Sequence, residues 1–110
     1  MAKSKYQLQI DNLLVKEDLP LLPIELLEDF TNLIKPLLQL DPLNFGGVYS
    51  SRNLIGKLQG FRALEIDLDN KVYRLVYRIY EKPAPRRVVL ISFGEHDPAY
   101  EKAKQRKHKS

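Results

Sequence analysis

The sequence predicts a small α+β domain with the element order β-α-α-β-β-β-α, in which N-terminal helices pack on one face of a small antiparallel sheet. Three observations lead to this prediction. Apolar residues recur at spacings of three and four between positions 24 and 38, whereas in later segments they alternate in twos. Proline and glycine separate these segments. A chain of 110 residues has room for one hydrophobic core, so we expect a single domain over residues 1–110.

The first elements are a strand and a short helix. Lys5–Ile10 alternates polar and apolar residues, which predicts a strand with Tyr6 on its buried face. Asp11–Asp18 can form a short helix, since aspartate is a good capping residue at its start. Pro20 and Pro23 then end it.

A longer amphipathic helix begins at Ile24. Its core stripe consists of Leu26, Leu27, Phe30, Leu33, Ile34, Leu37 and Leu38. Pro36 removes one backbone hydrogen bond, so we expect the regular helix to kink or end near Ile34. The Asp41–Pro42 pair stops it in either case. The polar, glycine-bearing stretch Leu43–Gly60 is predicted to be a loop.

The second half predicts three consecutive strands, Phe61–Leu68, Val72–Tyr80 and Arg87–Phe93. Asp69 and Asn70 form a tight turn between the first two, and the prolines of Glu81–Arg86 make that stretch a connection. A last helix runs from Asp97 or Pro98 to about Arg106, followed by a frayed basic tail at about 107–110.

The positive charge belongs to the second half. Residues 1–60 carry 6 Lys/Arg and 7 Asp/Glu, whereas residues 61–110 carry 12 and 7, so the formal net charge of +4 arises after Gly60. Such a distribution favours a polyanionic partner, either a nucleic acid or an acidic protein.

The composition also makes several kinds of site improbable. With no cysteine and only His96 and His108, we expect no metal site and no cofactor. The absence of cysteine suits a reducing compartment, and the N-terminus has no long apolar stretch. We therefore expect a soluble, cytoplasmic protein that does not bind a membrane.

Charged side chains collect on the predicted outer face of the sheet. A two-residue turn at Asp69 and Asn70 sets the register that places Glu65 opposite Arg74. The simplest explanation is a surface ion pair worth a few tenths of a kcal/mol. Adding Arg62 and Arg78 gives a cluster of guanidinium groups, which suits the recognition of phosphate.

Several short motifs resemble the RelE/ParE superfamily, the toxins of type II toxin–antitoxin systems. They are Lys57–Gly60 (Lys-Leu-x-Gly), Tyr73–Tyr77 (Tyr-Arg-Leu-Val-Tyr), Gly94–Asp97 (Gly-x-His-Asp) and Tyr100, which together extend over a little under half of the chain. The Tyr-Arg-Leu-Val-Tyr strand is the most specific of them. The order of elements also agrees with a RelE-like fold.

The resemblance implies a metal-free endoribonuclease that cleaves mRNA, usually at the ribosome, and that a cognate antitoxin inhibits. Attack of the ribose 2′-hydroxyl on the adjacent phosphate needs a base, a cation and an acid. By position, Arg74 matches the family arginine at the scissile phosphate, and His96 matches the acid or charge stabiliser. Tyr100 matches a tyrosine near the RNA, and Glu65 is the candidate base. His96 could instead cap the last helix, and Tyr100 could simply pack against the core.

The sequence departs from the family pattern at the strand before the turn. RelE has two lysines there, whereas this chain has Glu65 and Asp67. Lys57, Arg62 and Arg78 are expected to supply the missing positive charge by binding RNA phosphates. Two alternatives remain open: a ParE-like inhibitor of DNA gyrase that lacks ribonuclease activity, and a degenerate toxin fold that serves only as a binding domain.

Overall fold

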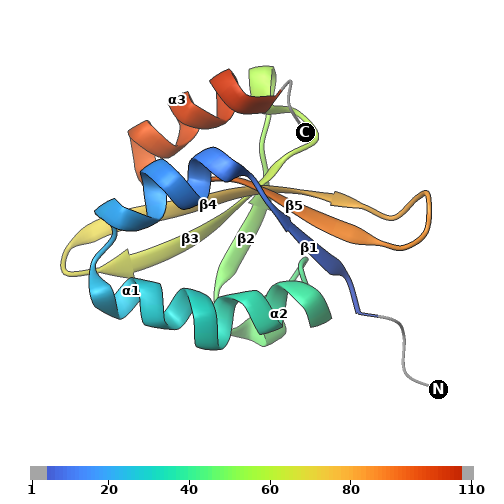
Figure 1. Ribbon diagram of the computed structural model, residues 1–110, viewed down its shortest axis with the longest axis horizontal. Coiled ribbons are helices and arrows are strands. Elements are labelled where there is room, and N and C mark those ends of the chain that lie inside the picture. Colours follow the sequence, from blue (N-terminus) through green and yellow to red (C-terminus); the bar gives the residue numbers. More distant parts are fainter. Residues whose placement is uncertain (1–4, 108–110) are drawn as a thin grey trace.

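A five-stranded sheet separates helices α1 and α2 from helix α3 in the computed structural model, which describes residues 5–107 (Figure 1). The strand order is β1-β5-β4-β3-β2. The strands are β1 (Gln7–Ile10), β2 (Ser50–Asn53), β3 (Arg62–Leu68), β4 (Lys71–Tyr80) and β5 (Arg87–Glu95). The α-helices are α1 (Ile24–Asp29), α2 (Lys35–Leu40) and α3 (His96–Arg106). The predicted α+β class is confirmed, and the predicted elements occur in the predicted order, with one additional strand, β2.

The register predicted for the β3–β4 hairpin is confirmed. Glu65 pairs with Arg74 and Ile66 with Tyr73. The turn residues Asp69 and Asn70 have φ angles of 51° and 64°, as a two-residue hairpin loop of the favoured hand requires. The turn chemistry therefore fixes which side chains of β3 and β4 lie side by side.

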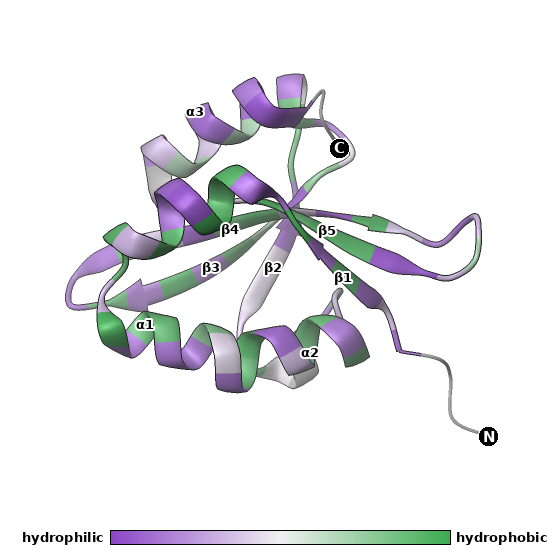
Figure 2. Cartoon of the chain, in the orientation of Figure 1, coloured by the Kyte–Doolittle hydropathy of each residue, from purple (hydrophilic) through white to green (hydrophobic). Residues whose placement is uncertain are grey.

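The prediction that Leu43–Gly60 is only a loop is wrong. Ser50–Asn53 forms β2, which pairs antiparallel with the outer side of β3, and 3₁₀ turns occupy Phe45–Gly47 and Gly56–Leu58. Figure 2 shows β2 in pale and purple tones, whereas β4 and β5 contain much of the hydrophobic sequence. A four-residue polar edge strand has no apolar alternation, so its pairing depends on a neighbour far away in sequence.

The strand β1 also joins the sheet in an unexpected way, since it pairs parallel with β5. The other strand pairs are antiparallel, so the sheet is mixed. Tyr6 is buried, and Leu8 and Ile10 pack against the core as predicted. Strand direction depends on the path of the connecting helices, which the alternation within Lys5–Ile10 does not encode.

The N-terminal helices cover one face of the sheet. A π-helical segment, Leu14–Asp18, and a 3₁₀ turn, Leu19–Leu21, precede α1. The prediction that Pro36 perturbs the long helix is confirmed in part, because a second π-helical segment, Phe30–Ile34, interrupts regular α-helix before helical structure resumes in α2. The wider π turn accommodates the missing amide of Pro36, which lies in the first turn of α2.

The last helix lies on the opposite face, so the outer face on which the sequence predicts the cluster of charges is partly covered. Val76, Val89 and Ile91 form an apolar patch on that face, and Ala103 of α3 is buried against it. We call this the α3 face, and the other the α1–α2 face. The predicted α3 is confirmed, whereas residues 108–110 of the predicted frayed tail lie outside the described residues.

No helix within residues 5–107 is both long enough and apolar enough to cross a membrane.

Candidate functional site

Arg74 lies on the α3 face but is not open to solvent, contrary to the sequence prediction. It is only 5% exposed, because α3 packs over β4 and brings Tyr100 onto the guanidinium group. The Nε of Arg74 donates a hydrogen bond of 3.2 Å to the hydroxyl of Tyr100, and Nη2 lies 3.4 Å from Oε2 of Glu65. The third nitrogen, Nη1, is buried and has no hydrogen-bond partner among the side chains and backbone that the structure describes. The sequence pattern could not reveal this cover, since it arises from the placement of α3.

One further residue, Arg52, completes this site, which we call the Arg74 cluster: Arg74, Glu65, Tyr100 and Arg52. Arg52 lies in β2 opposite Ala63, on the α3 face of the sheet, and is exposed. A side-chain hydrogen bond with Tyr100 is the main cause that raises the pKa of Arg52, and the charge of Glu65 acts in the same direction. The Glu65 side chain is 36% exposed. Two guanidinium groups therefore meet one phenol beside one accessible carboxylate.

The sequence did not identify Arg52 as a site residue, because it falls in the stretch predicted to be a loop. The Ser-Ser-Arg-Asn segment has no apolar alternation and resembles no motif. Its pairing with β3 is the only feature that brings it to Glu65. Arg52 can therefore be identified as a site residue only from the three-dimensional structure.

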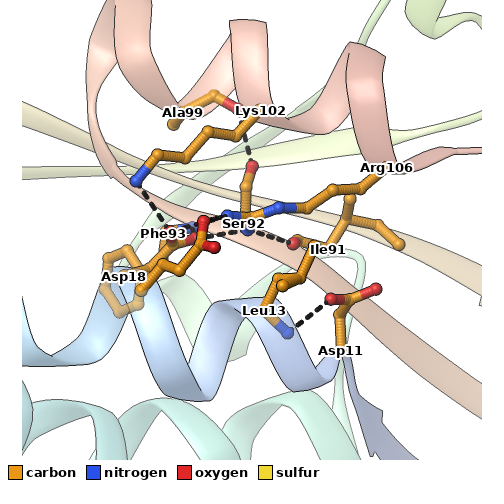
Figure 3. A network of polar contacts seen from close by, with 10 residues as sticks. Asp11, Leu13, Asp18, Ile91, Ser92, Phe93, Ala99, Lys102 and Arg106 are labelled. Atoms are coloured by element: carbon orange, nitrogen blue, oxygen red, sulfur yellow. Dashed lines mark hydrogen bonds and ion pairs between the residues drawn. The ribbon is translucent and has the colours of Figure 1, made fainter.

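A network at Asp18 holds α3, and with it Tyr100, against the sheet (Figure 3). The carboxylate of Asp18 is fully buried and accepts from the backbone amide of Phe93 at 2.9 Å. It also pairs with Nζ of Lys102 at 2.9 Å and Nη1 of Arg106 at 2.8 Å. The hydroxyl of Ser92 donates to the carbonyl of Ala99 at 2.6 Å. The N-terminal π-helical segment, β5 and α3 are thus tied together at one point.

Arg106 is buried like Arg74, but its guanidinium is well paired. Its Nη1 also donates to the carbonyl of Ile91 at 3.1 Å, and its Nη2 donates to Asp18 and to Glu17, each at 3.1 Å. Burial acts to lower the pKa of Arg106, but the hydrogen bonds and charge of Asp18 outweigh it, so that the pKa is raised. This arginine serves to hold α3 in place.

Arg62 does not join the cluster, contrary to the prediction. It pairs across the sheet with Tyr77, whose side chain belongs to the core of the α1–α2 face. Its guanidinium donates to Ser51 Oγ at 3.1 Å and to Asn53 Oδ1 at 2.8 Å. The alternation of a strand places Arg62 on the face opposite Glu65, so it secures β2 instead.

Arg78 lies on the α3 face but belongs to a separate group. Its guanidinium carbon is 5.4 Å from the ring centre of Phe61 and 5.1 Å from that of Tyr80. Arg87 stacks on the same Tyr80 ring at 4.2 Å. Val76, which is fully buried beside α3, lies between Arg78 and Arg74 along β4. The predicted single cluster of guanidinium groups is therefore divided.

The remaining predicted residues lie around α3. The backbone of His96 begins α3 two residues after Gly94, the direct strand neighbour of Arg74, but its side chain lies outside the described part of the structure. Lys57 is exposed in a 3₁₀ turn that contacts α3, and its carbonyl accepts from Nζ of Lys107 at 2.7 Å. The roles predicted for both residues are left untested by these positions.

The Arg74 cluster has the components of an anion site with an adjacent proton acceptor. Nη1 of Arg74 and the exposed Arg52 can donate to phosphate oxygens, since guanidinium geometry suits that group. Glu65 can accept a proton, and its contact with Arg74 orients its carboxylate.

Comparison with solved structures finds the same fold in toxin–antitoxin proteins. A chain in the crystal structure of the toxin–antitoxin complex RelBE2 from Mycobacterium tuberculosis matches with a TM-score of 0.66 and 22% identity, over 84% of this chain and 99% of that chain. The YoeB/ParE toxin from Agrobacterium tumefaciens matches with a TM-score of 0.62 and 20% identity, over 82% of this chain and 98% of that chain. No protein-family model and no curated protein matches the sequence. The resemblance to RelE/ParE toxins is thereby confirmed at the level of the fold.

Proposed function

We propose that the protein is the toxin of a toxin–antitoxin pair and cleaves mRNA at the ribosome in the cytoplasm. The observation that carries this proposal is the unpaired Nη1 of the buried Arg74, beside the carboxylate of Glu65. A buried guanidinium with an unused donor is costly, so such a group is often retained for a ligand. The fold shared with a toxin–antitoxin complex and with a toxin supports the same function.

The reaction needs only groups that this chain can supply. Glu65 takes the proton of the ribose 2′-hydroxyl, and the oxygen attacks the adjacent phosphorus to form a cyclic phosphate. Arg74 stabilises the charge that develops on the phosphoryl oxygens. The bond to the 5′-oxygen breaks, and His96 gives that oxygen a proton.

A phosphate can reach Arg74 only after a covering side chain moves. Tyr100 is the candidate, because its hydroxyl occupies Nε of Arg74 and it is only partly buried. The network at Asp18 holds the helix backbone, so a rotation of the Tyr100 side chain requires less disruption than a displacement of α3. The RNA phosphate then replaces the phenol as the partner of the guanidinium.

Substitution tests this function directly. Arg74→Met and His96→Ala should each abolish the growth arrest caused by expression of the protein, and each should reduce cleavage of mRNA on purified ribosomes. Arg86→Met is the matched control, since that guanidinium lies 4.1 Å from the ring centre of Tyr6, beside the β1 edge of the sheet and away from the Arg74 cluster. If both variants remain as toxic as the wild type, the assignment of the site is wrong.

A ParE-like inhibitor of DNA gyrase is the second candidate. The near-complete burial of Arg74 favours it, as do the acidic residues Glu65 and Asp67 where RelE has lysines. Gyrase poisoning induces the DNA-damage response before protein synthesis falls, whereas mRNA cleavage stops translation first. The order of these two events after induction distinguishes the candidates.

An antitoxin should inhibit either activity. Exposed cations of the α3 face, Arg52 among them, favour an acidic segment of such a partner. A small protein encoded beside this chain that restores growth on co-expression would identify it.

A further inference from the structure

A pocket of about 400 Å³ lies between the end of β2 and α3, next to the Arg74 cluster. Leu54, Ile55 and Leu58 form its apolar wall together with Tyr100. Ile55 is 87% exposed, so a large apolar side chain stands at the pocket without cover. The volume falls within the range of sites that bind small molecules or single ligand groups.

Cations flank this apolar wall. Arg52 and Lys104 also line the pocket. Lys104 Nζ pairs with Oε1 of Glu101 at 3.3 Å on the exposed side of α3, so its charge is partly balanced. Arg52 is exposed, and its neighbour Tyr100 is a phenol. An occupant with a flat apolar part and an attached anion would satisfy both features.

We propose that this pocket binds a nucleobase of the RNA strand adjacent to the scissile phosphate, with Arg52 holding the phosphate of that nucleotide. The inference rests on the proposed ribonuclease function and adds a subsite to it. Tyr100 belongs both to the pocket wall and to the Arg74 cluster, so the two sites adjoin, and one RNA strand can occupy both once the Tyr100 side chain has turned away from Arg74. Proteins that recognise single-stranded RNA bind unstacked bases on aromatic and apolar side chains and track the backbone with cations.

An acidic protein segment with an apolar anchor is the competing occupant. The shared Tyr100 favours RNA, since Arg74 donates to this phenol and Arg52 lines the same pocket, so that two guanidinium groups flank one path for a polyanionic strand. An apolar anchor alone would not need both arginines. Ile55 offers a clean test because its high exposure means that its replacement should leave the fold intact.

The experiment measures RNA affinity with and without the base. A labelled RNA hexamer, protected by 2′-deoxy substitution at the cleavage position, is titrated with the full chain, alone and on programmed ribosomes. Hexamers that lack one base at each position in turn are compared. For the wild type, loss of one base should weaken binding about tenfold, the scale of a single stacked base. Ile55→Ser should weaken the complete hexamer to a similar extent and should remove the penalty for the missing base.

The control is Ile24→Ser, at another exposed isoleucine, 73% accessible in α1 on the opposite face, which should change neither affinity. If the wild type binds RNA but Ile55→Ser retains the full penalty for the missing base, the pocket assignment fails and the proposed function stands. If a synthetic peptide of alternating glutamate and leucine displaces RNA from the wild type but not from Ile55→Ser, the pocket binds protein and the inference is overturned. If the wild type neither binds nor cleaves RNA in either form, the proposed function fails as well.

Discussion

Two buried arginines, one in β4 and one at the end of α3, lie between α3 and the sheet, and their environments differ. Arg106 is 3% exposed and donates to Asp18, Glu17 and a backbone carbonyl. Arg74 is 5% exposed but has one weak ion pair, one phenol and an Nη1 nitrogen that no group in the described part of the chain pairs with. A guanidinium kept for stability should be fully paired, whereas one kept for a ligand can leave donors unused. The comparison therefore indicates a structural role for Arg106 and supports the proposal that Arg74 takes part in the activity.

The largest effect should follow from the removal of Asp18. Asp18→Ala leaves Arg106 and Lys102 without their shared partner. It also leaves the buried backbone amide of Phe93 without its hydrogen-bond acceptor. We expect the free energy of unfolding to fall by about 3–5 kcal/mol, as for other broken buried pairs. Urea denaturation at pH 7 measures it. Glu17→Ala, at a carboxylate that is 55% exposed, should cost less than about 1 kcal/mol. If the free energy of unfolding fell equally in Asp18→Ala and Glu17→Ala, the buried pair of Arg106 with Asp18 would have no special part in stability, and the contrast between Arg106 and Arg74 would fail.

A smaller stability effect and a large functional one should follow from Arg74→Met. Methionine fills similar space and removes the unpaired donor, so the free energy of unfolding should change by less than about 1 kcal/mol. The rate of mRNA cleavage should fall by about 10²–10³, the scale of one lost charge-stabilising donor. Denaturation and single-turnover cleavage on ribosomes measure the two quantities. An unchanged cleavage rate would show that Arg74 has no part in the reaction.

Removal of the Tyr100 hydroxyl should have an intermediate effect. Tyr100→Phe takes away the acceptor for Nε of Arg74 but keeps the ring that packs against the core of the α3 face. The free energy of unfolding of Tyr100→Phe should be lower than that of the wild type by about 1 kcal/mol, the net value of one hydrogen bond. If the hydroxyl only covers Arg74 in the free protein, RNA affinity should rise by a few fold, and fluorescence anisotropy can detect the change. A loss of affinity instead would show that the phenol contacts RNA directly.

The smallest effect should be seen with the exposed Arg52. Arg52→Ala should leave stability unchanged within about 0.5 kcal/mol, since the side chain is at the surface. The slope of log affinity against log salt for single-stranded RNA should decrease by about 0.7, which corresponds to one phosphate contact. Lys71→Ala, at a lysine whose side chain is 60% exposed beside the hairpin turn, is the control and should leave the slope nearer to its original value. A slope that Arg52→Ala does not alter would exclude this residue from the RNA path.

The difference between the two arginines also shows what could be predicted from the sequence. Local chemistry determined the hairpin: Asp69 and Asn70 set the turn, and the turn set the pair Glu65 and Arg74. The periodicity of the apolar residues predicted the long helix and the buried face of each major strand. Relations between distant segments were not accessible in this way. The pairing of β2 with β3 and the position of α3 depend on contacts across many residues, and those contacts bury Arg74 and add Arg52 to the site.

The failed predictions share this cause. The sequence pattern groups Arg78 with Arg74 because both lie on one face of the same strand, and it adds Arg62 because this residue begins the neighbouring strand. The alternation of β3 sends Arg62 to the other face, and the apolar patch at Val76 separates Arg78 from Arg74. Charge composition thus indicates a polyanion partner for the chain as a whole, but the packing of α3 decides which arginine is buried beneath Tyr100.

The most direct test compares the free energy of unfolding of the wild type and of Arg74→Met, each with and without a saturating, non-cleavable RNA hexamer. A ligand that binds only the folded state stabilises it, by about 2.7 kcal/mol at a hundredfold excess over its Kd. We predict that the two proteins are equally stable without RNA and that only the wild type is stabilised by it. If Arg74→Met is as unstable as Asp18→Ala and is still stabilised by RNA to the same extent as the wild type, Arg74 is a structural residue and the central claim is contradicted.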